Sequence, residues 1–216
     1  MKVLLLCIFF IFFIALTLSG CGSSNLLRNG SFEQGEAPWF ALESWERFAL
    51  SERHARDGRY AARVTLQAAP PDQGSQIAGL IQEISPQEFP KKLSGFYRVE
   101  HWVRGTPKQY LQGVVIVWGG QKKFPNIQIR YIFAGITEPP FLLRNGRFVF
   151  VGASEPRLGE WVFFERDLHR DFAELWGRIP TGFEKIRVLL EVRYDEKSPG
   201  QALAADVYYD ALYLGD

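Results

Sequence analysis

The chain has 216 residues, 47% of them hydrophobic and 15% aromatic, and its 25 Lys and Arg side chains nearly balance 24 Asp and Glu. This length and apolar content suit one sizeable folded domain. The balanced charge gives no electrostatic basis for binding nucleic acid, and two cysteines are too few for a disulfide framework.

The N-terminal segment has the order of an export signal. Lys2 precedes an apolar run from Val3 to Leu18, and Leu18-Ser19-Gly20-Cys21 then leads into small polar residues. This pattern resembles a bacterial lipoprotein signal. It predicts a signal peptide at 1–20, attachment of lipid such as palmitate to Cys21, and a lipidated tether at 21–25. A membrane-spanning anchor is the alternative, because the apolar run approaches the shortest length that crosses a bilayer.

Processing at Cys21 predicts where the domain works. Residues 26–216 would be held in the cell envelope: at the outer membrane of a Gram-negative cell, otherwise on the outer face of the cell membrane. Gly22 favours the outer membrane, because it stands where inner-membrane lipoproteins often carry aspartate. Cys7 would leave with the signal and Cys21 would carry lipid, so no thiol would remain for chemistry.

After the signal, short apolar or alternating runs rich in Val, Ile, Tyr, Phe and Trp recur between turn residues, which is typical of strands. Asn145-Gly146 between two apolar triplets predicts a two-residue hairpin. One short helix is expected near 168–176, with Phe172, Leu175 and Trp176 on one face and Pro180 beyond its end. The predicted strands are 60–66, 79–84, 95–103, 111–118, 127–133, 141–151, 161–165, 186–194 and 207–214. The fold class is therefore all-β.

Six motifs in order resemble one family, the galactose-binding-like jelly rolls that serve as cellulose- and xylan-binding carbohydrate-binding modules. They begin with Asn25-Leu26-Leu27-Arg28-Asn29-Gly30-Ser31-Phe32-Glu33 and cover nearly the whole region after the signal. The motifs lie at 25–33, 57–64, 80–84, 97–105, 159–164 and 207–215. The resemblance implies a jelly-roll β-sandwich, and it is more specific for fold than for ligand.

Alternation along three predicted strands yields candidate ligand-binding residues. In a sandwich, alternate side chains face outward, and a sugar needs flat rings for its C–H faces and polar groups for its hydroxyls. The outward sets that combine these types are Arg98, Glu100 and Trp102; Gln128 and Arg130; and Glu191 and Arg193. They form one site if their strands are neighbours in one sheet. The alternative is a solvated sheet face with cross-strand ion pairs.

The resemblance also implies a structural Ca²⁺ that joins the first strand, an early loop and the last strand. Carried over to this chain, Glu33 and Asp210 would be carboxylate ligands and Ser31 would offer its carbonyl, in keeping with the oxygen ligands that calcium prefers. The loop that should complete the site, 51–58, contains three basic residues among its acids and so departs from an acidic loop. Alternatively, Glu33 and Asp210 bind backbone amides or pair with arginines.

Motifs for catalysis are missing from the sequence. The three histidines His54, His101 and His169 lack zinc-ligand spacing, and carboxylate pairs such as Glu100 and Glu191 are expected by chance among 24 acids. The sequence therefore predicts a lipid-anchored, non-catalytic binding module of the cell envelope that binds carbohydrate. The alternative is a structural or protein-interaction lipoprotein in an envelope complex. The expected partners are the membrane, through the lipid, and a polysaccharide or an envelope protein, but not nucleic acid.

Overall fold

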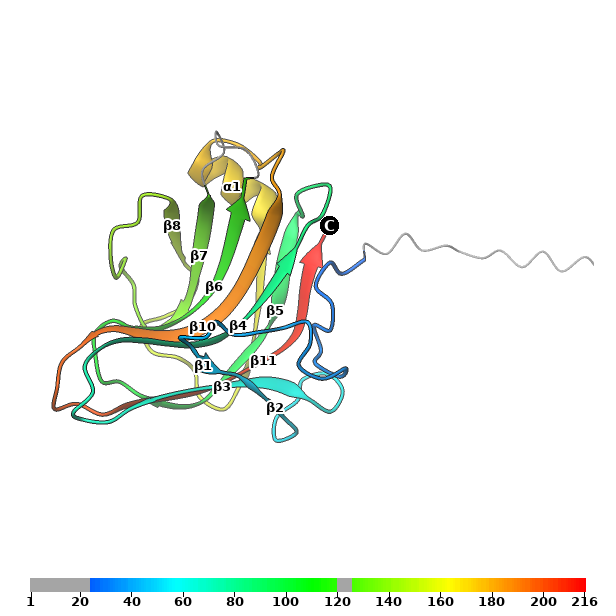
Figure 1. Cartoon of the computed structure of the whole chain (residues 1–216). Helices are drawn as coiled ribbons and strands as arrows, with labels where there is room; N and C mark the ends of the chain where they lie inside the picture. Colours follow the sequence, from blue (N-terminus) through cyan, green and yellow to red (C-terminus); the bar gives the residue numbers. More distant parts are fainter. Residues whose placement is uncertain (1–23, 120–125) are drawn as a thin grey trace, which may run out of the picture.

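A computed structural model describes residues 24–119 and 126–216, which form two sheets packed face to face (Figure 1). The six-stranded sheet has the order β1 (Glu46–Arg47), β4 (Gly74–Ile84), β10 (Lys185–Lys197), β6 (Gln109–Trp118), β7 (Ile127–Ala134), β8 (Gly146–Phe150). The five-stranded sheet has the order β2 (Ala49–Ser51), β3 (Ala61–Ala68), β11 (Leu203–Gly215), β5 (Lys92–Val103), β9 (Trp161–Asp167). The helix α1 (Leu168–Trp176) lies at one end of the sandwich. The prediction of an all-β sandwich with one short helix is confirmed.

The core lies between the sheets and is built from alternate positions of each strand. On β6 these are Leu111, Val115 and Val117, and on β10 they include Val188 and Leu190, all at most 1% exposed. The intervening residues of the same strands point away from the other sheet, because successive side chains of a strand alternate between its faces. We call that side of a sheet its outer face.

The hairpin expected at Asn145-Gly146 is wrong. β8 pairs with β7 in parallel, with Gly146 beside Gln128, and residues 141–143 form no strand. A two-residue turn joins only antiparallel neighbours, so a parallel partner needs a longer connection. Residues 135–145 supply it, and Phe141 within them lies over Arg130 and Arg193 on the outer face of the six-stranded sheet.

The first described residues are part of the fold. The Asn25 amide donates to Leu212 O and its Oδ1 accepts from Leu214 N, while Leu26 N donates to Leu214 O. Asn25, which the sequence places in the tether, is thus bound to the last strand, and the chain enters the sandwich beside its C-terminus (Figure 1). The predicted signal peptide 1–20 and Cys21 lie outside the described residues. Among the described residues, no helix is long and apolar enough to cross a bilayer.

Candidate functional site

Polar side chains gather on the outer face of the six-stranded sheet, where β10, β6 and β7 run side by side. Strand register places Glu191 opposite Gln112 and Arg193 opposite Tyr110. On the other side of β6, Arg130 lies opposite Val114. We call the following residues the polar cluster: Tyr110, Gln112, Gln128, Arg130, Glu191, Arg193 and Asp195.

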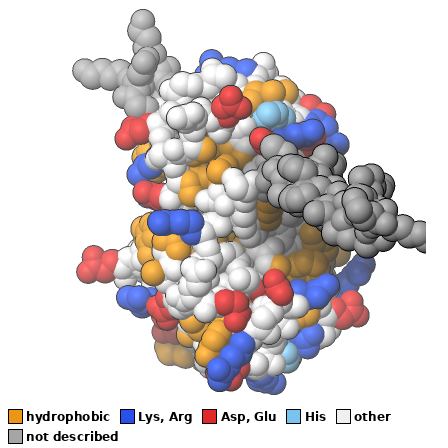
Figure 2. Space-filling view, turned by 90° about the vertical axis from the view of Figure 1, so that its right-hand side faces the viewer, with side chains coloured by type: hydrophobic (Ala, Val, Ile, Leu, Met, Phe, Trp, Pro, Cys, Tyr) orange, Lys and Arg blue, Asp and Glu red, His pale blue; other side chains and the backbone are white. Residues whose placement is uncertain are grey.

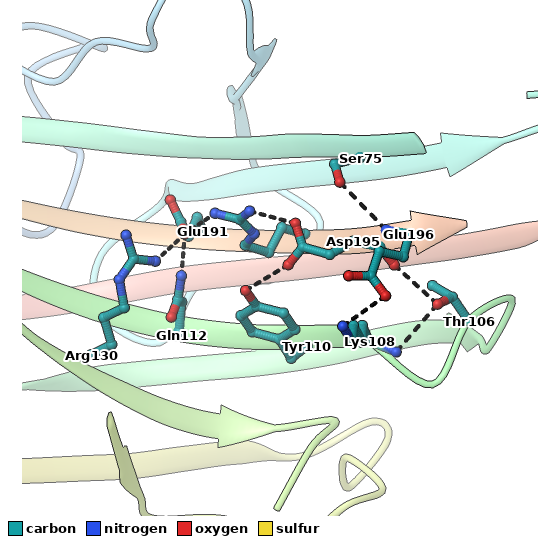
Figure 3. Close-up of polar contacts among 10 residues, drawn as sticks. Ser75, Thr106, Lys108, Tyr110, Gln112, Arg130, Glu191, Asp195 and Glu196 are labelled. Atoms are coloured by element: carbon teal, nitrogen blue, oxygen red, sulfur yellow. Dashed lines mark hydrogen bonds and ion pairs between the residues drawn. The ribbon is translucent and has the colours of Figure 1, made fainter. Parts of the chain in front are cut away.

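Glu191 is the centre of the polar cluster (Figure 3). Its Oε1 accepts a hydrogen bond from Gln112 Nε2 and lies 3.7 Å from Arg130 Nη1 and 3.6 Å from Arg193 Nη1. Glu191 is 2% exposed and Gln112 is fully buried. Glu191 is a buried charge with several partners, and its pairing with Arg130 of β7 is an ion pair between strands of the kind that the alternative expected.

The network continues along β10 toward the end of the sheet. Asp195 accepts hydrogen bonds from Arg193 Nη2 and, at 2.8 Å, from the Tyr110 hydroxyl. Beyond it, Thr106 Oγ1 donates to the Asp195 carbonyl, and Lys108 pairs with Glu196 at 2.7 Å (Figure 3). A cavity of about 480 Å³ opens next to this end, lined by Thr106 among others.

Burial and neighbouring charges together set the pKa values of these groups. Burial lowers the pKa of Arg130, against the opposing effect of Glu191. Burial acts in the same direction on Arg193, but Glu191, Tyr110 and Asp195 together outweigh it and raise the pKa. Burial also raises the pKa of Tyr110 far above its usual value, so this hydroxyl stays protonated. Two arginines against two carboxylates make the polar cluster electrically neutral.

Three polar atoms of the cluster have no hydrogen-bond partner among the described residues, although each is shielded from solvent. They are Gln112 Oε1, Arg130 Nη1 and Arg193 Nε. One is an acceptor and two are donors. Because buried polar groups are nearly always hydrogen-bonded, these atoms mark where a ligand or water would be bound.

Apolar and aromatic side chains surround the polar cluster on the same face. Phe40, Trp45 and Ile116 are partly exposed and pack on Ile81, Val114 and Leu189. The Phe141 ring lies over the guanidinium groups of Arg130 and Arg193, at 5.7 and 5.6 Å from their central carbons. The face thus combines rings with hydrogen-bonding groups.

The structure brings together only four of the seven predicted ligand-binding residues: Gln128, Arg130, Glu191 and Arg193. Arg98, Glu100 and Trp102 lie on β5, which belongs to the other sheet, so the expected single face is wrong. The strict alternation of β5 also fails, because its register with β11 shifts between Asp206 and Val207. Trp102 consequently packs against the core between the sheets.

Arg98 and Glu100 form a second charged group, on the outer face of the five-stranded sheet. Arg98 Nε donates to Glu100 Oε1, and His54 Nε2 lies 3.4 Å from the same oxygen. His54 in turn packs edge-on against Tyr208, whose ring lies below the Arg63 guanidinium. These residues pair among themselves and are separated from the polar cluster by the thickness of the sandwich.

The carboxylates predicted to bind calcium face N–H groups in this structure. Glu33 Oε1 accepts from Arg59 N and Tyr60 N, at 2.8 and 2.7 Å. Asp210 accepts from Arg56 N, Asp57 N and Ala211 N. No group of three or more His, Cys, Asp or Glu that could hold a metal occurs in the described part of the chain. These carboxylate oxygens accept from backbone amides, an arrangement that fits amides rather than a cation. The contacts do not test calcium binding itself, so calcium at Ser31, Glu33 and Asp210 stays a prediction.

Sequence reasoning missed Tyr110, Gln112, Asp195 and Phe141. The first three could have been found from the same alternation. Gln112 is at an outward position of 111–118, and extending the predicted strands 111–118 and 186–194 by one residue puts Tyr110 and Asp195 at outward positions too. No sequence pattern pointed to Phe141 as a site residue, because residues 141–151 resembled a strand. The position of Phe141 depends on the parallel pairing of β8.

The sequence matches no known protein family and no characterised protein. Solved structures do match. TmCBM61 in complex with beta-1,4-galactotriose is 16% identical, with 89% of this chain and 98% of that chain covered and a TM-score of 0.45. The CBM22-1 xylan-binding domain of Paenibacillus barcinonensis Xyn10C is 13% identical, covering 89% and 95%, with a TM-score of 0.46. A cellulase derived from Cel12A of Rhodothermus marinus is 12% identical, covering 77% and 90%, with a TM-score of 0.44. At these identities and scores, the likeness carries no argument about what this chain binds.

Proposed function

We propose that this protein is a lipid-anchored, non-catalytic module of the cell envelope that binds a neutral glycan on the outer face of its six-stranded sheet. The observation that carries the proposal is the polar cluster: Gln112, Arg130 and Arg193 each have a buried polar atom without a hydrogen-bond partner among the described residues, beside partly exposed rings. A sugar offers both hydroxyls for such atoms and apolar C–H faces for such rings.

The three atoms without a hydrogen-bond partner among the described residues are one acceptor and two donors, and this mixture favours a ligand with hydroxyl groups. A hydroxyl donates and accepts, so two neighbouring hydroxyls can serve Gln112 Oε1 and an arginine N–H together. A carboxylate can only accept, and here it would meet the Glu191 carboxylate at the centre of the cluster. The neutral balance of the polar cluster therefore favours a neutral glycan over an acidic one.

Several observations support binding without hydrolysis or nucleic-acid recognition. Glu191 and Asp195 are held by arginines and, in the case of Asp195, by Tyr110, which suits charge pairing better than proton transfer. Glu100 and Glu191, the carboxylate pair named from the sequence, lie on different sheets. On the side shown in Figure 2, acidic and basic side chains are interspersed, so this side carries no broad basic patch for a phosphate backbone.

Glycan binding is tested with two matched arginine variants. The full-length protein in detergent would be run in affinity gels with soluble xylan, galactan and hydroxyethylcellulose, and with polygalacturonate as the acidic counterpart. Arg130 and Arg98 are both mostly buried and paired with a glutamate, but they lie on opposite sheets. We expect Arg130→Ala to abolish retardation by a neutral glycan and Arg98→Ala to leave it unchanged.

Other outcomes would redirect the proposal. If Arg98→Ala abolishes binding instead, the site lies on the five-stranded sheet. If no polysaccharide retards the folded protein, glycan binding is overturned and an envelope protein becomes the expected partner. The lipid anchor is tested separately, by labelling cells with palmitate and fractionating their membranes: Cys21→Ser should lose both the label and the membrane association.

A further inference from the structure

Residues 135–145, which we call the covering loop, place one aromatic ring over the polar cluster. Phe141 contacts both guanidinium groups of the cluster and meets Phe148 of β8 edge-on, with ring centroids 5.6 Å apart. A ring within 6 Å of a guanidinium group is attracted to its charge. Phe141 is therefore the residue through which the covering loop contacts both arginines of the polar cluster.

The groups beneath this ring are those that the proposed function needs. Gln112 and Tyr110 are fully buried, and the free atoms of Gln112, Arg130 and Arg193 are shielded from solvent. A glycan can reach these atoms only if the side chains that shield them move, and the Phe141 ring lies over two of the three residues. Leaving buried polar atoms without partners is costly, so a ligand that supplies hydroxyls favours the uncovered state.

The start of the covering loop is anchored, because Ile136 is buried in one cluster with Tyr110 and Ile132, whereas several residues on either side of Pro140 are exposed. Leu142, next to Phe141, is 100% exposed, and Thr137, Glu138 and Pro139 are exposed as well. The loop begins at Gly135, whose φ of +106° is strained for other residues and where a Cβ would lie 2.3 Å from Gln109 O. The cavity of about 480 Å³ is lined by this same start, Gly135 to Glu138.

We propose that Phe141 is the gate of the glycan site: it covers the polar cluster in the free protein and swings out, with the exposed residues that follow it in the covering loop, when a neutral glycan binds. The inference rests on the proposed function. It assigns Phe141 to regulating access, and it accounts for polar atoms that are buried and also lack a hydrogen-bond partner among the described residues. A purely structural role would instead keep the ring in place whether or not glycan is bound.

Limited trypsin cleavage after Arg144, an exposed residue of the covering loop, reports on opening without any ligand. Loss of the ring should raise the population of the open loop, and with it the cleavage rate. We expect Phe141→Ala to be cut about tenfold faster than the wild type, since a ring over two guanidinium groups is worth roughly that factor. Leu142→Ala, the matched control at the exposed neighbour, should be cut at the wild-type rate.

Cleavage after Arg63 in β3 serves as the internal control for unfolding, because this strand is paired on both sides. Equal rates for Phe141→Ala and the wild type would overturn the gate, and so would a parallel rise at both Arg144 and Arg63. Excess soluble xylan, or whichever neutral glycan of the panel binds, should speed cleavage after Arg144 in the wild type. Binding without that change would also overturn the gate. If no glycan binds, the proposed function fails, and the ligand-free rates alone decide whether Phe141 holds the loop.

Discussion

At the scale of single residues, two carboxylates hold one turn of backbone. Glu33 accepts two N–H groups from residues 59 and 60, and Asp210 accepts two from residues 56 and 57. Gly58 lies between these pairs with φ of +73°, and a Cβ there would meet the Glu33 carboxyl at 2.5 Å. Glu33, from the first sequence motif, and Asp210, from the last, thus fix the turn before β3. Their hydrogen bonds to backbone amides account for both carboxylates without a metal ion.

Replacing Asp210 should be among the most damaging single changes in this part of the fold. Asp210 is fully buried, and Asp210→Ala would leave three backbone N–H groups without an acceptor. We expect the free energy of unfolding in urea to fall by about 3 kcal/mol, since each unsatisfied buried group costs about 1–3 kcal/mol. Glu36→Ala, at an exposed position, should change it by less than about 0.5 kcal/mol. A change in Asp210→Ala as small as that of the control would contradict this account of the turn.

At the scale of elements, α1 shows how a short helix is stabilised at both ends. The Asp167 side chain accepts from Arg170 N at the N-terminus, and Gly177 ends the helix with φ of +72°. Arg166 holds Asp171 through paired hydrogen bonds, and Phe172 is buried in the core. The predicted apolar face of Phe172, Leu175 and Trp176 is confirmed. Capping and burial together fix a helix too short to be stable alone.

The N-terminal cap of α1 predicts a pH-dependent effect. The hydrogen bond from Arg170 N is the main cause of the lowered pKa of Asp167. Stability from this carboxylate is therefore present above its unfolded-state pKa and is lost as the pH falls through the lower folded-state pKa. We expect Asp167→Ala to lower the melting temperature at neutral pH, with the difference from the wild type shrinking in acid. Asp167→Ser, which keeps a capping oxygen, should melt close to the wild type; equal losses for both variants would exclude capping as the cause.

At the scale of the whole molecule, an apolar core joins the two sheets while each outer face carries its own paired charges. Glu191 lies among Arg130, Arg193 and Gln112 on one face, and Glu100 lies beside Arg98 and His54 on the other. Each buried charge depends on its partners, because an unpaired charge in such a place is strongly destabilising. Among the described residues, the six-stranded face adds the Phe141 ring over two of its arginines, which distinguishes the two faces.

The calcium prediction is tested on the whole domain, because the metal would join the first strand to the last. Thermal unfolding of the protein would be followed with excess calcium and with a chelator. The amide contacts of Glu33 and Asp210 lead us to expect coincident curves. A ligand that binds only the folded state would raise the melting temperature. A shift with calcium that is lost in Asp210→Asn would show that these carboxylates rearrange around the ion.

The sequence by itself determined the fold class, most strand positions, the helix and its inward face, and the strands on which four of the site residues lie. These follow from local chemistry: alternation, turn residues and capping act within a few positions of the chain. It also predicted export and lipidation at Cys21, which the described residues do not include.

Only the tertiary structure decided which strands are neighbours, and therefore which residues form one site. The pairing of β6 with β10 brings Gln112 to Glu191, and assignment of β5 to the other sheet removes Arg98 and Glu100. The parallel pairing of β8 turns an expected hairpin into the loop that carries Phe141 over the polar cluster. Strand order and bulges depend on contacts between distant segments, and a local pattern of residues does not encode them.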